Sequence, residues 1–283
     1  MIKTLFLSLT LLIVMLMTAV YFGIQNENAD TAGLVRQMES SARQENRTVD
    51  FTRLNKLPAP VQRYFKTVLT DGQPMIERAV LEQTGRLKIT PETAEWSKFA
   101  ADQTVSATTP GFVWDARVLI APLIHVRVRD AYINSEASGK VSLMSLILMG
   151  KESSRPKLDS GALFRYLAEA VWYPTALLPE SGVTWEGIDE TRAIATLKDG
   201  ENTVSLEFRF NDMGEVTGIY TQKRYGLFDG AYEQHPWEGK FSHYEWHNGF
   251  KIPTQAEVGW HLPKGWWLFW QGTVRRIIFE YGK

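Results

Sequence analysis

The stretch "KFSHYEWHNGFKIPTQAEVGWHLPKGWWLFWQG", residues 240–272, decides the fold. Two short turns, "NG" and "PKG", separate three segments in which apolar and polar side chains largely alternate. A period of two is typical of a half-buried strand, and Asn-Gly is a strong hairpin signal because both turn positions favour positive φ. The stretch therefore predicts three antiparallel strands joined by hairpins.

The same pattern extends back to about residue 79. "LIHVRVRD" alternates strictly, "KDGE" and "NDMG" supply further hairpin turns, and we interpret "ASG", residues 137–139, as another turn. One clear helix interrupts the strands in "LDSGALFRYLAEAVWYPTALLP", where apolar residues recur at helical spacing before Pro174. A shorter helix follows Pro58 in "LPAPVQRYFKTVL".

These signals predict a mainly β (α+β) fold: a single large curved antiparallel sheet, or half-barrel, of about 11–12 strands. We expect it to span residues 57–283, with covering helices near 60–69 and 160–173. Three tryptophans and a phenylalanine crowd residues 265–272. They favour an aromatic core, and they leave open a cavity for an apolar ligand or a lipid-facing rim.

Composition excludes several classes of function. The net charge is −1, which gives no electrostatic footprint for nucleic acid. The chain has no Cys, which excludes disulfides, cysteine-based zinc sites and cysteine nucleophiles. Phosphate-binding loops and dinucleotide fingerprints are absent from the sequence, so we expect no cofactor.

The N-terminus predicts a membrane anchor. No charged residue occurs from Thr4 to Ile24, a length that matches the hydrocarbon core of a bilayer. Lys3 precedes this run while Glu27 and Asp30 follow it, which places the C-terminal part outside the cytoplasm. We therefore expect a single-pass protein of the inner (cytoplasmic) membrane with an extracytoplasmic domain; a cleaved signal sequence is the alternative.

These expectations divide the chain into three parts. Residues 1–25 form the transmembrane anchor or signal sequence, residues 26–56 form a polar stalk or linker, and residues 57–283 form the β domain. Within the linker, Leu34, Val35 and Met38 recur at helical spacing, which indicates a short surface helix.

Several segments carry a resemblance. "LPAPVQRYF", "PGFVWDA", "FRYLAEAVWYPTALLP" and "NGFKIPTQAEVGW" resemble an uncharacterised bacterial family that carries only a domain-of-unknown-function label. At the level of fold, a long antiparallel sheet interrupted by a helix also resembles the lipoprotein-carrier half-barrels of the bacterial envelope, of the LolA and LolB type. That resemblance implies a concave apolar face that holds acyl chains under helical lids.

Two sets of residues are candidates for a site. The ligand-binding candidates are large aromatic side chains and one ion pair of the long helix: Phe112, Trp114, Tyr132, Arg165, Glu169, Trp172, Trp246 and Trp260. Arg165 and Glu169, one helical turn apart, would mark a polar point in an apolar pocket, and Asp130, Arg127 and Asp115 on adjacent strands could extend it.

The second set is "HYEWH", in which His243, Glu245 and His247 project from one face of a regular strand. Two histidines and a carboxylate are suitable zinc ligands, although the polar outer face of an amphipathic strand is the simpler explanation.

The sequence thus favours a membrane-tethered protein that binds an apolar or lipid-like molecule in a curved sheet, without catalysis. The alternatives are an envelope scaffold with a solid core and a metal-dependent hydrolase that uses His243, Glu245 and His247.

Overall fold

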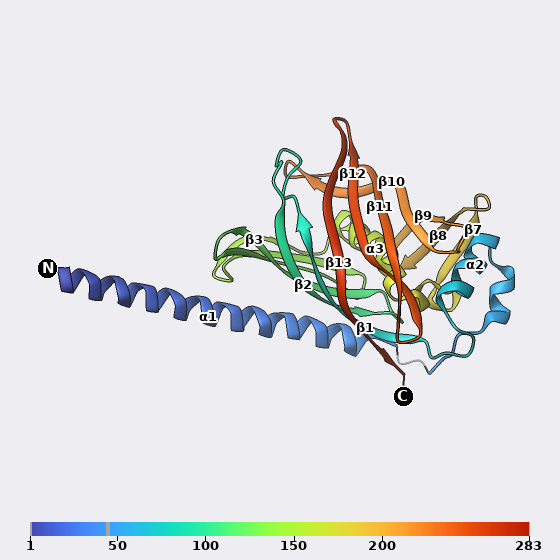
Figure 1. Ribbon diagram of the computed structural model, residues 1–283, viewed down its shortest axis with the longest axis horizontal. Helices are drawn as coiled ribbons and strands as arrows, with labels where there is room; N and C mark the ends of the chain where they lie inside the picture. The colour runs from blue at the N-terminus through green and yellow to red at the C-terminus, as the bar shows by residue number, and fades with distance from the viewer. Residues whose placement is uncertain (1, 44–45, 283) are drawn as a thin grey trace.

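The computed structural model describes residues 2–43 and 46–282 (Figure 1). Its centre is one antiparallel sheet of 13 strands in the order β6-β5-β4-β3-β2-β1-β13-β12-β11-β10-β9-β8-β7. This confirms the predicted half-barrel. The strands are β1 (Ile76–Leu87), β2 (Ser97–Ser106), β3 (Gly111–Ala121), β4 (Ile124–Ile133), β5 (Glu136–Leu143), β6 (Ile147–Glu152), β7 (Val183–Gly187), β8 (Arg192–Asp199), β9 (Asn202–Phe210), β10 (Val216–Phe228), β11 (Ala231–His247), β12 (Phe250–Leu262) and β13 (Gly265–Tyr281).

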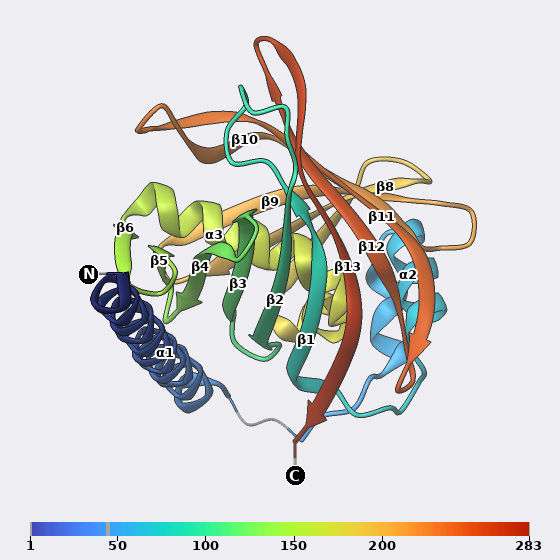
Figure 2. The same ribbon diagram turned by 60° about the vertical axis from the view of Figure 1, so that its left-hand side comes forward.

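The order explains how the chain fills its own interior. Two meanders, β1–β6 and β7–β13, join where β1 pairs with β13, so β6 and β7 lie at opposite edges. The segment between these edges crosses the concave side of the sheet (Figure 2). The helices and 3-10 turns are α1 (Ile2–Ser41), η1 (Phe51–Lys56), α2 (Ala59–Val68), α3 (Pro156–Glu169), η2 (Ala170–Trp172), η3 (Pro174–Leu177) and η4 (Pro179–Ser181).

The crossing segment packs the concave side. Leu163, Leu167, Val171, Tyr173 and Leu177 are fully buried and belong to one apolar cluster with the inward side chains of the sheet. Burying each side chain of this size stabilises the fold by roughly 1.5–3 kcal/mol. Where α3 and the 3-10 turns lie, the interior is therefore a packed core.

One β-bulge explains why both faces of "GWWLFWQG" look apolar. Val258 of β12 pairs with Trp270 and the next residue, Gly259, pairs with Leu268, so Phe269 is an extra residue on β13. This bulge reverses the alternation, so Trp267, Phe269 and Trp270 all contact the one apolar core.

One predicted turn is wrong. Residues 137–139 lie inside β5, and the chain turns instead at Asn134 and Ser135, both of which have positive φ. Asn readily adopts this conformation, so the turn is made by its backbone preference rather than by the glycine at 139.

The N-terminal helix α1 runs without a break from the apolar run to Ser41. Its first part is exposed, and it is the one helix in the described residues that is long and apolar enough to cross a membrane. Its second part lies on the outer face of β2, β3 and β4, where Leu34, Val35 and Met38 pack against Val113 and Ile133.

Candidate functional site

A connected polar network lies on the concave side of the sheet, next to α3. Arg165 Nε donates to Glu169 Oε1 at 2.7 Å, and Arg165 Nη1 donates to Asp130 Oδ2 at 2.9 Å. Gln103 Nε2 donates to the second Glu169 oxygen at 2.6 Å, and Gln83 Nε2 donates to Gln103 Oε1 at 3.1 Å. The network therefore links α3 to β1, β2 and β4.

Aromatic rings surround the Arg165 guanidinium. Its central carbon lies 4.8 Å from the ring centre of Phe112 and 4.9 Å from that of Trp114, within the range of cation–π attraction. Trp114 Nε1 donates to Gln83 Oε1 at 2.9 Å, so the ring is also held by the network. The structure thus brings four of the predicted ligand-binding residues together: Phe112, Trp114, Arg165 and Glu169.

Arg224 of β10 adds a second cation to the same region. Its guanidinium donates to the Gly161 carbonyl of α3 and lies 4.4 Å and 5.1 Å from the ring centres of Trp237 and Trp260. It forms no ion pair with any carboxylate of the described residues. Burial, and then the neighbouring charge of Arg165, lower the pKa of Arg224 to about 9.

Asp130 lies in a partly enclosed position. Its side chain keeps 40% of its surface exposed, yet burial raises the pKa of its carboxyl against the opposing charge of Arg165. The carboxylate is surrounded by protein and open to water at one edge, which accounts for both the exposed surface and the raised pKa. Burial would also lower the pKa of Arg165, but Glu169 and Asp130 outweigh it and raise that pKa.

Rings beside the network are only half-buried. Phe228, Trp267, Phe269 and Trp270 pack against the core and retain exposed surface; we call them the half-exposed aromatic surface. Ring contacts connect this aromatic surface to Trp114 of the network and to Trp260 beside Arg224. Trp270 stacks on Phe99 at 5.7 Å, Phe99 contacts Trp114, and Phe228 contacts Trp260 at 5.3 Å.

The remaining aromatic candidates divide by burial. Trp172, packed edge-on against Phe241, and Trp260 are almost fully buried. Tyr132 is fully buried, and its hydroxyl donates to Asp199 at 2.8 Å, which links β4 of the first meander to β8 of the second. Trp246 is 58% exposed, so it does not line the interior as expected.

The predicted metal ligands are not grouped. His243 has a φ of 57° and is skipped in the pairing of β11 with β12, a local distortion of the strand that was assumed to be regular, and its Nδ1 lies beside Ser242 Oγ. His247 and Glu245 approach to 3.7 Å without a third ligand. Within the described residues no three His, Asp or Glu side chains form a group that could hold a metal ion.

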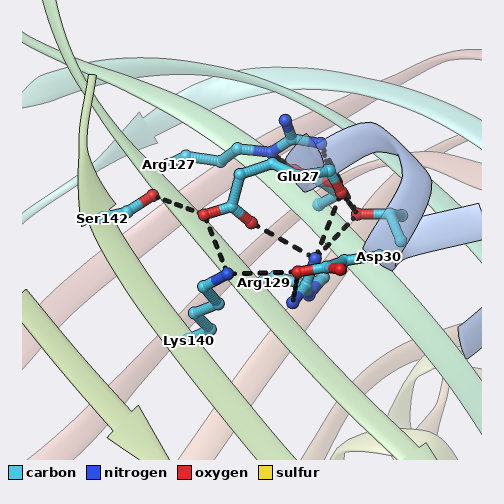
Figure 3. A network of polar contacts seen from close by, with 8 residues as sticks. Glu27, Asp30, Arg127, Arg129, Lys140 and Ser142 are labelled. Atoms are coloured by element: carbon cyan, nitrogen blue, oxygen red, sulfur yellow. Dashed lines mark hydrogen bonds and ion pairs between the residues drawn. The ribbon is translucent and has the colours of Figure 1, made fainter. Parts of the chain in front are cut away.

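A second polar network joins α1 to the outer face of the sheet (Figure 3). Glu27 accepts from Lys140 Nζ at 3.1 Å and from Ser142 Oγ at 3.1 Å, and pairs with Arg129 at 3.3 Å. Arg127 Nε donates to Asp115 at 2.8 Å. Asp115 and Arg127 therefore belong to this outer network, not to the concave one that the sequence suggested.

Sequence reasoning missed Gln83, Gln103 and Arg224. The two glutamines occupy inward positions of alternating strands, and a polar residue in an inward row is the signal that could have identified them. Arg224 lies beyond a register shift of β10, so the alternation of the strand does not predict which face of the sheet its side chain occupies.

Comparisons with solved structures give distant similarities of chain path. A LolA superfamily protein from Nitrosomonas europaea is 9% identical, with a TM-score of 0.42 over 78% of this chain and 92% of that chain. A putative outer membrane lipoprotein-sorting protein domain from Vibrio parahaemolyticus is 10% identical, with a TM-score of 0.39 over 73% and 86%. The sequence matches none of the curated proteins with which it was compared. Residues 55–279 match the family of unknown function DUF6920, and the chain belongs to that family.

Proposed function

We propose that this protein is tethered to the cytoplasmic membrane by α1 and binds an amphipathic, lipid-like molecule on the extracytoplasmic side, without transforming it. The apolar run from Thr4 to Ile24 supplies the tether, and Lys3 marks its cytoplasmic end.

One observation carries the binding part of the proposal: a half-exposed aromatic surface lies directly beside a charged network on the concave side. Apolar rings exposed at the edge of a core, next to a few convergent polar groups, are typical of a site for a molecule with an apolar body and a polar end. Phe228, Trp267, Phe269 and Trp270 receive the apolar part.

The polar end of the ligand is anionic in this proposal. Arg165 already contacts two carboxylates, whereas Arg224 contacts two aromatic rings and a backbone carbonyl but no carboxylate of the described residues. A guanidinium without a carboxylate partner favours a phosphate or carboxylate group, which it can bind through two parallel hydrogen bonds.

A scaffold function is the second candidate, and the packed interior favours it. Tyr173, Leu163 and Leu167 fill the concave side without residual exposure, as expected of a solid core. In this case the half-exposed rings contact another protein instead of a lipid.

Photocrosslinking of the full chain in detergent tests the proposal. The probe is a phosphatidylglycerol that carries a diazirine in one acyl chain, and peptide mass spectrometry locates the adducts. We expect adducts on the peptides that contain Phe228 and Trp267–Trp270, because acyl carbons lie against these rings.

A matched pair of variants serves as the control. Trp267→Ala removes a ring of the proposed site and should reduce these adducts, whereas Trp246→Ala removes an exposed ring elsewhere and should leave them unchanged. Adducts confined to residues 2–24 of α1 in the wild type would refute binding by the sheet and favour the scaffold.

A further inference from the structure

Two neighbouring hairpin tips expose large apolar side chains. The β3–β4 tip exposes Leu119, Ile120, Leu123 and Ile124, and the β5–β6 tip exposes Leu146, Ile147, Leu148 and Met149. Exposed apolar residues that occur singly are common, but a contiguous group of this kind marks a contact with another surface.

The conformation of the first tip makes the choice of residue unusual. Leu123 is 91% exposed and has a φ of 65°. A turn position of this kind is ordinarily occupied by Gly or Asn, which adopt positive φ easily and are compatible with water. A leucine bears the steric cost of positive φ and is not compatible with water, so its presence here is explained by a side chain that enters an apolar environment.

The tips lie beside the point where α1 changes from apolar to polar. A Cβ built on Gly23 would lie 2.4 Å from the Ser145 carbonyl oxygen and 3.1 Å from Leu146 Cδ2, so the backbone of α1 touches the β5–β6 turn. Gly23 and Ile24 end the apolar run, and Glu27 is already buried against the sheet. Figure 1 shows this end of the sheet projecting alongside the middle of α1.

We propose that both hairpin tips insert into the outer leaflet of the same bilayer that α1 crosses. This inference rests on the membrane tether of the proposed function and is independent of ligand binding. The last apolar turn of α1 and the Leu146–Met149 tip lie at one level, so a bilayer that covers the first also reaches the second.

The charges around the tips suit a lipid surface. No Asp, Glu, Lys or Arg occurs from Val118 to Val126 or from Val141 to Gly150, while the exposed cations Arg117 and Lys151 stand at the bases of the two hairpins. Cations at this height attract the phosphates of anionic lipids, and the apolar tips beyond them enter the acyl region.

Insertion would fix the orientation of the half-barrel on the membrane. One helix alone allows a domain to rotate about the helix axis, whereas a helix and two hairpins form three separate points of contact. The outer network at Glu27 holds α1 against the same strands that carry the tips.

The absence of cysteine from the chain makes the test direct. Leu123→Cys and Leu148→Cys in the full chain are labelled with the environment-sensitive fluorophore NBD and reconstituted into vesicles of phosphatidylethanolamine and phosphatidylglycerol. We expect blue-shifted emission that is largely lost when the vesicles contain lipids with doxyl groups on their acyl chains.

Met213→Cys is the matched control, because Met213 is an exposed apolar residue in the turn between β9 and β10, next to α2. Its label should emit as in water and resist the doxyl lipids. If the labels at 123 and 148 behave like the label at 213, the inference is overturned. Carbonate extraction of the same vesicles separates this outcome from a failure of the tether, since a chain that α1 does not anchor is released.

Discussion

Glu27 of α1 and Arg129 of β4 form an ion pair at 3.3 Å in which both side chains are less than one-tenth exposed. Lys140 and Ser142 also contact the Glu27 carboxylate. Buried charges are costly unless they are paired, so the helix and the sheet are fixed in one relative position. The segment after the apolar run is thus part of the folded domain.

Glu27→Gln should release the second part of α1 from the sheet. The variant removes the buried carboxylate that Arg129 and Lys140 share and leaves them only the more exposed Asp30. Breaking a buried ion pair costs about 3–5 kcal/mol. Hydrogen exchange of residues 26–41 in the detergent-solubilised full chain measures the release. Asp30→Asn is the control, because Asp30 is 55% exposed and its pairs should contribute at most about 1 kcal/mol. Equal exchange in the two variants would contradict the role of Glu27.

The outer network shows where sequence reasoning succeeds and where it ends. The alternation in "LIHVRVRD" predicts that Arg127 and Arg129 share a face, and the spacing of Leu34, Val35 and Met38 predicts a helix; both are confirmed. That these two features meet could not be predicted, because their partners are about 100 residues apart and no local pattern records the contact.

The concave side shows a different limit. The hairpin signals predict the antiparallel sheet, and the spacing in α3 predicts the pair Arg165 and Glu169, which is confirmed. The bulge at Phe269 of β13 is not visible in the sequence, and it changes which rings face inward. The metal interpretation of His243, Glu245 and His247 also assumed a regular strand, whereas the backbone is distorted at His243 and the described residues hold no group of three metal ligands.

Gly272→Ala should disturb the half-exposed aromatic surface. A Cβ at this position would lie 2.2 Å from the Trp270 ring, so the ring must move off the strand. Overpacking of this kind costs about 1–3 kcal/mol. Gly150→Ala is the control, since a Cβ there meets nothing within 4 Å. Chemical denaturation and tryptophan fluorescence of both variants test the expectation; an unchanged midpoint for Gly272→Ala would refute the close packing.

Asp130→Asn should be tolerated at neutral pH, and the stability of this variant relative to the wild type should fall as the pH falls. Burial raises the pKa of this carboxyl above its unfolded value. At a pH above the folded pKa, the buried charge therefore lowers the free energy of unfolding of the wild type, and this loss disappears as the carboxyl takes up a proton. The amide carries no such cost at any pH. Midpoints of denaturation for the variant and the wild type, measured from pH 7 toward 4, should therefore converge or cross.

Glu169→Gln provides the contrast to Asp130→Asn. Glu169 accepts from Arg165 through one carboxylate oxygen and from Gln103 through the other. The amide of Gln has only one oxygen, so it cannot accept both hydrogen bonds in this way. The loss should be about 1–3 kcal/mol at neutral pH. If Asp130→Asn proves the more destabilising change at neutral pH, the buried charge of Asp130 does not destabilise the wild type and that assignment is wrong.

Arg224→Gln should weaken binding of an anionic amphiphile while the fold persists, because the glutamine amide can still donate to the Gly161 carbonyl. A hydrogen bond to a charged group contributes about 1.5–3 kcal/mol, which corresponds to roughly a tenfold to hundredfold rise in Kd. Lys223→Gln removes the same charge at an exposed neighbouring position and should have little effect. The wild type should also lose affinity as the pH rises through about 9, where Arg224 gives up its proton, and Arg224→Gln should lack this step. Equilibrium binding of a fluorescent fatty acid and of its uncharged methyl ester, measured on either side of that pH, distinguishes a charge contact from apolar binding alone. A step that persists in Arg224→Gln would assign the recognition of the anion to another group.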